Sequence, residues 1–518
     1  MTTIDCLNEI KSRYILEHII KHLEKIKFFE VIRYNKSLQN KINITLNDYK
    51  EFASIELEVL FEPELPIHPN LFGSNFNHKK ENDLNFRHRH NYAFFSHRKH
   101  HNPLNILLDT FLNLKNDDDG QNENKKNEND FNFNLQNDYR INFDPIINVT
   151  KENSQFFHFY YNDNTKEEEK KEFLVMPKSV TKMKIKIDAN IKSFTGLFKG
   201  CGLERINFVK FKRNNIYDMN EMFCECKKLK EINFINFETS NVKNMEKMFA
   251  GCYSLKEINL SKFIISNVTN MSNMFEGCSS LIKINFSNFN TQNLINMSKI
   301  FKGCSSLQEL DLSNFKTHNV TSMSGSFQEC INLKELNLSN LNTSKVSNMS
   351  FMFCKCEALK EINLSNFDTS KVLDMSYMFS GCKSLSLLDM NSFDTNNVCN
   401  MSYMFDNCLL IKELNLSNFN TSKVWNMSFM FNNCFNLEIL DIFNFDTSNV
   451  LNMNNMFFNC QKLVEINLSN FKTDKVQKMD HIFDYCSNHL RMQTEKLSQF
   501  KRKKEKDKDK TSSPCICQ

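Results

Sequence analysis

The sequence has no long run of apolar residues. No window approaches the roughly 18 consecutive apolar residues that a membrane-spanning helix needs. The first 29 residues leave no uninterrupted apolar core for a secretory signal, because charges interrupt them at Asp5, Glu9, Lys11, Arg13 and Glu17. We therefore expect the chain to stay in the cytosol, where its 18 cysteines would stay reduced.

Strong net charge and catalytic motifs are also missing. The 65 Lys and Arg nearly cancel the 61 Asp and Glu, which predicts no dedicated nucleic-acid partner. No Ser/His/Asp set, paired acid at fixed spacing, Gly-rich phosphate loop or metal cluster occurs, so we expect no enzyme and no cofactor. Gly, Pro and Trp are scarce at 10, 7 and 1, whereas Asn is abundant and Phe reaches 49. This composition is unlike that of an ordinary globular protein.

A repeated phrase begins near Leu203. Its phenylalanine returns every 26 residues, at Phe223, Phe249, Phe275, Phe301, Phe327, Phe353, Phe379, Phe405, Phe431, Phe457 and Phe483. Eleven units without an insertion indicate a repeat array.

The spacing of apolar residues changes within each unit. Leu333, Leu336 and Leu338 fit a short strand, whereas the next apolar residues recur at steps of 3, 4 and 3, which predicts one face of a helix. These residues are Val346, Met349, Phe353 and Cys356. Thr343 and its counterparts Thr369, Thr395, Thr421 and Thr447 are placed where a hydroxyl could cap the helix start. Each unit is therefore predicted to be strand, turn and helix.

The units are expected to fold only when they stack on one another. One unit has too little apolar surface to offset its ordering entropy, but neighbouring coils cover each other's Leu, Phe, Met and Cys rows. The predicted fold class is an α/β solenoid of the leucine-rich-repeat kind, with a parallel sheet on the concave side and short helices on the convex side. Eleven strands at the usual spacing would make a sheet roughly 50 Å long.

The repeat resembles the BspA-like leucine-rich repeats, a 26-residue class known from bacterial surface proteins and expanded in protists. The resemblance rests on phrases such as LSNFDTSKVLDMSYMFSGC, residues 364–382, and covers about residues 200–486. It implies a solenoid used for adhesion or protein binding, with no catalytic residues to carry over. Unlike the bacterial members, this sequence shows no export signal.

Four segments are expected along the chain. Residues 1–50 would form a helical module, and the run 14–39 has a faint resemblance to an F-box without the usual Pro and Trp landmarks. Residues 51–200 would form a cap containing strands at 55–60, 156–161 and 183–188, with a disordered Asn- and His-rich insertion at about 68–142. The solenoid would occupy 201–490, and 491–518 would be a basic disordered tail.

The tail ends in a lipidation-like motif. Cys515-Ile-Cys-Gln518 fits a C-a-a-X box, and its final Gln favours farnesyl on Cys515. Upstream lysines supply the second signal that stable anchoring to an anionic membrane needs. The alternative is a Lys-rich tail with a cysteine four residues from its end, since Glu505, Asp507 and Asp509 dilute the charge and Cys517 fits the box poorly.

Two other residue sets invite a metal interpretation. One cysteine per unit, from Cys226 to Cys486, is better explained by packing, since a buried thiol behaves as a small hydrophobe and zinc needs four converging ligands. The histidines between His88 and His101 lie in the predicted insertion, where a loose metal site, a nucleic-acid contact or composition alone could account for them.

The exposed strand positions form the candidate binding surface. Side chains that alternate with the inward leucines should project from the concave sheet. One column is mainly Glu and the next Asn or Asp, which favours a basic or polar peptide; the alternative is that these are the repeat's ordinary solvated residues. Leu387 and Ile439 break the first column. The candidate partner-binding residues are Glu335, Glu361, Leu387, Asp389, Glu413, Ile439 and Asp441.

Three functions remain open. The first is a monomeric protein-interaction scaffold, tethered by prenylation to the cytoplasmic face of a membrane. The second is a ubiquitin-ligase adaptor that docks a cullin complex through residues 14–39. The third is a surface adhesin, which glycan on sequons such as Asn348-Met-Ser350 would favour.

Overall fold

The structure is a computed structural model, and it describes residues 54–60, 139–141, 145–167, 175–177, 180–211, 214–235 and 237–495. Residues 1–62 and 140–518 belong to one unit and 63–139 to another, and the fold below is that of the first. The predicted helical module, the histidine-rich segment and Cys515 lie outside the described residues.

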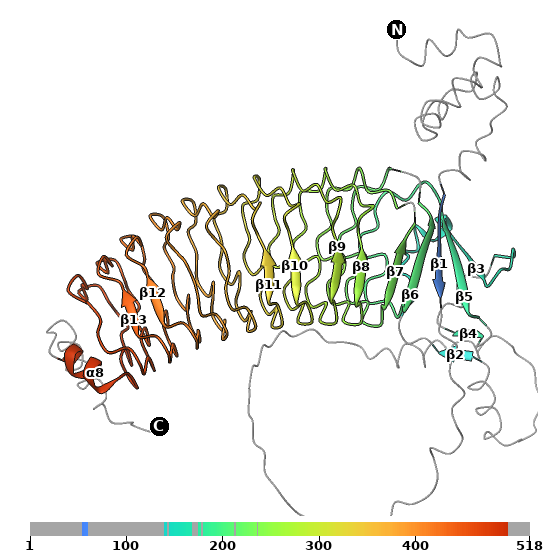
Figure 1. The fold of residues 1–518 in the computed structure, drawn as a ribbon. Coiled ribbons are helices and arrows are strands. Elements are labelled where there is room, and N and C mark those ends of the chain that lie inside the picture. Colours follow the sequence, from blue (N-terminus) through green and yellow to red (C-terminus); the bar gives the residue numbers. More distant parts are fainter. Residues whose placement is uncertain are drawn as a thin grey trace, which may run out of the picture. The chain divides into compact units, whose positions relative to one another are not determined.

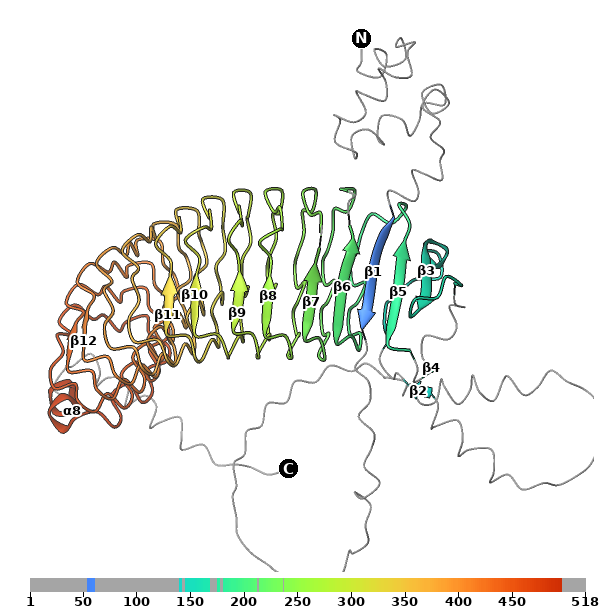
Figure 2. The same cartoon turned by 45° about the vertical axis from the view of Figure 1, so that its right-hand side comes forward.

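Short parallel strands in most of the coils build the solenoid (Figure 1). They are β6 (Arg205–Lys210), β7 (Glu231–Phe234), β8 (Glu257–Asn259), β9 (Lys283–Asn285), β10 (Glu309–Asp311), β11 (Glu335–Asn337), β12 (Glu413–Asn415) and β13 (Ile439–Asp441). Neighbours pair in register, as Glu309 with Glu335 does. Between β11 and β12 the same row continues as a single parallel bridge between Glu361 and Leu387. Figure 2 shows β6 to β11 side by side in one row.

The core consists of rows of identical side chains. The repeated phenylalanine is buried in every coil from Phe223 to Phe483. Successive rings along this row stack nearly parallel with centroids 5.4 to 5.9 Å apart. Each ring thus covers the next, and only the two ends of the row need another cover.

The predicted helices are replaced by consecutive turns. In the coil of Phe353, the amides of Met349, Phe351 and Phe353 donate to carbonyls of the next coil at 2.9 to 3.0 Å, whereas those of Met352 and Cys354 donate three residues back along the chain. An α-helix instead needs every amide bonded four residues back. The 3, 4, 3 spacing therefore places Val346, Met349, Phe353 and Cys356 in the core through turns, and the described residues 214–487 contain no helix.

The threonines have another role than the predicted helix cap. Thr343 is 1% exposed, and its hydroxyl donates to the carbonyl of Asp368 in the next coil at 2.8 Å. Thr317 makes the same bond to the carbonyl of Asn342 and also accepts from the amide of Asn342 at 2.8 Å. The hydroxyl row therefore joins coils, because there is no helix to cap.

A mixed sheet closes the N-terminal end. Its order is β3 (Phe157–Tyr161), β5 (Lys182–Ile187), β1 (Ile55–Leu60), β6 and β7, with β1 antiparallel to both its neighbours. These strands coincide with the predicted strands at 55–60, 156–161 and 183–188. The short 3-10 helix η2 (Ser154–Phe156) precedes β3.

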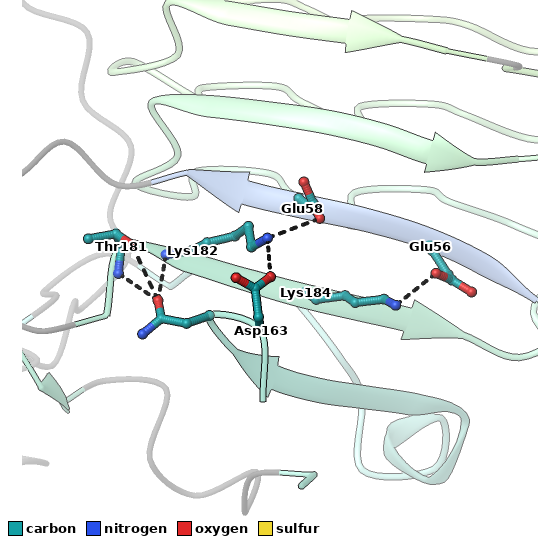
Figure 3. Close-up of polar contacts among 7 residues, drawn as sticks. Glu56, Glu58, Asp163, Thr181, Lys182 and Lys184 are labelled. Atoms are coloured by element: carbon teal, nitrogen blue, oxygen red, sulfur yellow. Dashed lines mark hydrogen bonds and ion pairs between the residues drawn. The ribbon is translucent and has the colours of Figure 1, made fainter. Parts of the chain in front are cut away.

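Complementary charges line the outer face of this sheet. Glu56 and Glu58 of β1 alternate with its buried apolar residues, and the ammonium groups of Lys184 and Lys182 on β5 approach them at 3.0 and 3.5 Å (Figure 3). Lys182 also contacts Asp163 at 2.6 Å, and this hydrogen bond raises the pKa of Lys182. The charges favour the observed pairing of β1 with β5.

Two predicted boundaries are wrong. The last residues of the expected insertion form β2 (Tyr139–Ile141), which pairs with β4 (Val175–Pro177). At the other end, α8 (Asn488–Glu495) extends into the segment assigned to the tail, and its Leu490 is fully buried.

Candidate protein-binding surface

The strand face is the surface formed by the outward residues of the strand row. Along β7, β8, β10, β12 and β13, exposed and buried residues alternate. Glu335, Glu361 and Glu413 are exposed. Parallel in-register pairing puts the equivalent residues of successive coils in one column, about 4.8 Å apart.

In the second column of this face, the Asp side chains accept hydrogen bonds from backbone amides. Asp389 accepts from the amide of Asn391 at 2.9 Å, and Asp441 accepts from the amide of Phe443 at 3.3 Å. Such side-chain bonds to the amide two residues on shape the turn that follows the strand. One carboxylate oxygen of each predicted site residue in this column therefore has a structural role.

Exposed apolar side chains interrupt the polar strand face at Val209 and Ile235, which are 43% and 47% exposed, and more strongly at three residues of later coils. Leu387 is 66% exposed, Ile439 58% and Phe443 57%. The bridge between Glu361 and Leu387 and the pairing of Glu413 with Ile439 put both aliphatic residues in the glutamate column, two coils apart. We call Leu387, Ile439 and Phe443 the strand-face apolar patch. Glutamates flank it in the same column.

A second exposed apolar row lies on another side of the same coils, and the sequence reasoning missed it. Leu373 is 52% exposed, Trp425 46% and Leu451 36%. Their amides and carbonyls link successive coils, as in the bond from the Leu451 amide to the Trp425 carbonyl at 2.9 Å. The sequence does carry a signal for this row, because one repeat position is apolar in several successive units. That position lies in the segment predicted to be a helix, so it was not considered as part of an exposed surface.

Four aromatic rings form a third feature that the sequence reasoning missed. Phe351, Tyr377, Tyr403 and Phe429 occupy one position in successive turns and stack at 4.3 to 4.4 Å. All four have positive φ, between 57° and 59°, a conformation that costs about 1 to 3 kcal/mol for side-chain-bearing residues. Burial raises the pKa of Tyr377, and the neighbouring Tyr403 adds to the shift. Stacking offsets part of the backbone cost.

The cysteine row is structural. Each ladder thiol is buried, and from Cys252 onward each donates to the carbonyl of the repeated phenylalanine in the preceding coil, as Cys330 does to Phe301 at 3.1 Å. Burial raises the pKa of Cys278 and of Cys330 to about 12, so these thiols are poor nucleophiles. Among the described residues, no group of three His, Cys, Asp or Glu side chains could hold a metal ion.

No helix within the described residues is long and apolar enough to cross a bilayer. The stacked coils, with a row of short parallel strands and bridges and mainly leucine or isoleucine at the inward positions, define a leucine-rich-repeat solenoid.

The family described as "Mycoplasma protein of unknown function, DUF285" matches residues 192–310, 295–413 and 384–495. Together these matches span 192–495, which is more than half of the 518 residues. The chain belongs to this family, in agreement with the BspA-like resemblance. No curated protein matches the chain significantly.

Two solved structures are similar to parts of the chain. One is a chain of the TLR13–ssRNA13 complex, with 15% identity and a TM-score of 0.21, covering 54% of this chain and 57% of that one. The other is a leucine-rich repeat protein from Eubacterium ventriosum, with 13% identity and a TM-score of 0.23, covering 55% of this chain and 90% of that one. The present chain thus spans little more than half the length of the first.

Proposed function

We propose that the solenoid is a non-enzymatic scaffold whose strand face binds a protein partner. The observation that carries the proposal is the strand-face apolar patch, where Leu387, Ile439 and Phe443 are each more than half exposed and glutamates flank them. Apolar groups with polar surroundings are typical of interface anchors. The described coils commit their inward residues to stacking, which leaves the outer faces for recognition.

The flanking charges indicate the chemistry of the partner. Glu361 and Glu413 are exposed beside Leu387 and Ile439 in the same column. A segment with apolar side chains next to Lys or Arg would bury its apolar groups on the patch and place its cations beside these carboxylates. We propose such a segment as the ligand of the strand face.

Replacing Leu387 and Ile439 together by Glu tests this proposal. Glu is the usual residue of this column, and Glu309 and Glu335 are already paired neighbours in it. The double variant is therefore expected to stay folded, with only a small loss of melting temperature from the added like charges. Loss of the two anchors should reduce recovery of partners at least tenfold, since each hot-spot side chain contributes about 2 kcal/mol or more. Quantitative mass spectrometry after affinity capture measures the recovery.

Ile235→Glu is the matched control. Ile235 is 47% exposed and occupies the repeat position of Phe443, but it lies outside the patch. Its variant should recover the same partners as the wild type. Equal recovery by the Leu387 and Ile439 double variant would contradict the strand-face proposal.

We further propose that farnesyl on Cys515, with the basic tract before it, tethers the scaffold to the cytoplasmic face of a membrane. The support is the fit of residues 515–518 to a C-a-a-X box. Cys515→Ser should move an N-terminally tagged protein from the membrane fraction to the soluble fraction, and so should extra residues appended after Gln518. Cys517→Ser should leave it membrane-bound. Identical fractionation of all forms would rule the tether out.

A further inference from the structure

Glycines hollow out the turn side of the N-terminal coils. Gly251, Gly277 and Gly303 occupy one repeat position in three successive coils and line a cavity of about 440 Å³. We call this hollow the glycine trough. Glu225 and Glu329, at the same repeat position in the coils before and after, stand at its two ends.

The backbone alone does not require these glycines. Their φ angles are 73° to 74°, but Asn407, Asn433 and Asn459 adopt φ of 57° to 63° at the equivalent position. Elsewhere in the repeat, side-chain-bearing residues therefore occupy this left-handed conformation. What the glycines add is the absence of side chains, so that backbone forms the floor at Gly277 and Gly303, whereas the Glu225 carboxylate lies over Gly251.

The walls carry nearly balanced and paired charges. Lys302 contacts Glu276 at 2.8 Å, and Lys199 and Lys247 contact Glu221 at 2.6 and 3.8 Å. Carboxylates and ammonium groups thus alternate along the trough. A phosphate or another strongly charged ligand would have to separate existing pairs, and an apolar ligand would leave these polar groups without water.

One aromatic ring leans over the floor. Cε1 of Tyr253 would lie 3.4 Å from a Cβ placed on Gly277, and the tyrosine is 42% exposed. The ring therefore offers an apolar edge beside the polar walls. This combination suits a ligand with both hydroxyl groups and an apolar C–H surface.

We propose that the glycine trough binds a neutral oligosaccharide. Sugar hydroxyls donate to carboxylates and accept from ammonium groups at once, so they can join the wall charges without disrupting the pairs. The C–H face of one sugar ring packs against Tyr253. The glycines recur at the coil spacing of about 4.8 Å, close to the length of one hexose unit in an extended chain. The trough therefore accommodates about two units over Gly277 and Gly303 and a third against the Glu225 carboxylate.

Binding of neutral trisaccharides to the full chain tests the proposal. The ligands are maltotriose, cellotriose, mannotriose and N-acetylchitotriose, each compared with its monosaccharide by saturation-transfer NMR and calorimetry. At least one trisaccharide is expected to bind, and its monosaccharide at least tenfold more weakly. Gly277→Asn should lower the affinity of that trisaccharide tenfold or more. Asparagine is native to this position at Asn407, and a Cβ on Gly277 meets nothing closer than 3.4 Å.

Two controls separate loss of the site from loss of the fold. Gly381→Asn makes the same change at the same repeat position outside the trough and should leave binding unchanged. Tyr253→Ala should weaken binding, whereas Tyr253→Phe should retain it. The proposal is overturned if none of the four trisaccharides binds, or if Gly277→Asn binds as the wild type does. The strand-face partner lies elsewhere on the coil, so either proposal can fail alone.

Discussion

Asparagine is abundant because its side chain joins the coils. Asn293 and Asn449 each donate to a backbone carbonyl of the preceding coil at 2.7 Å. Asn348 accepts from both the amide and the hydroxyl of Ser350, at 2.9 and 2.7 Å, which fixes a turn. The Asn-Met-Ser triplet therefore has a folding role, which accounts for its recurrence without a glycan. Composition showed the abundance of asparagine but gave no reason for it.

Asp406 provides a test at the residue scale. It is 8% exposed and accepts from the side chains of Asn432, Asn407 and Ser380 at 2.6, 2.8 and 3.2 Å. Burial nevertheless raises its pKa above the ordinary 3.8, so its charged form destabilises the fold at neutral pH. Asp406→Asn should raise the melting temperature at pH 7.

The pH dependence of that difference has a fixed sign. As the pH falls through the raised pKa, the native carboxyl takes up a proton before the unfolded one does, and the cost of the buried charge disappears below the unfolded value. Melting curves of wild type and Asp406→Asn should therefore converge toward pH 4. A gap that widens on acidification would contradict this account.

At the scale of elements, the sequence predicted strands set by local alternation correctly, but it mispredicted turns whose hydrogen bonds run to the next coil. The alternating IELEVL of β1 predicted both the strand and its buried face, Ile55, Leu57 and Val59. The 3, 4, 3 spacing after Val346 predicted the correct buried residues in the wrong element. Turns and helices bury residues at the same spacing, and the hydrogen bonds that decide between them run to the next coil, which a local pattern does not report.

The cap strands yield a test at this scale. Glu56→Lys with Glu58→Lys would place five lysines together across β1 and β5, including Lys186 opposite position 56, where ion pairs now lie at 3.0 and 3.5 Å. Like charges on paired strands repel, and we expect a loss of about 1 to 2 kcal/mol in unfolding free energy. Denaturant unfolding measures it.

Adding Lys182→Glu and Lys184→Glu to that variant restores opposite charges and should recover most of the loss. If the fourfold variant is no more stable than the double one, the charges do not help to hold β1 in the sheet.

At the scale of the molecule, the 26-residue period alone predicted a stacked array and its exposed strand columns. It also identified Leu387 and Ile439 as departures from the pattern, and both are exposed. The turn-side features escaped because they depend on neighbouring coils. The glycine trough needs Gly251, Gly277 and Gly303 together, and the aromatic stack needs four rings that are 26 residues apart in sequence.

In-register stacking is the claim on which both proposed surfaces depend, and engineered disulfides test it most directly. Glu309 and Glu335 are paired neighbours on β10 and β11, whereas Glu361 lies one further coil away. A disulfide needs Cα atoms about 4.4 to 6.8 Å apart, and the coil spacing is about 4.8 Å. Under mild oxidation, Glu309→Cys with Glu335→Cys should therefore cross-link nearly completely, and Glu309→Cys with Glu361→Cys should not. Equal cross-linking of the two pairs, or none in either, would contradict the stacked solenoid.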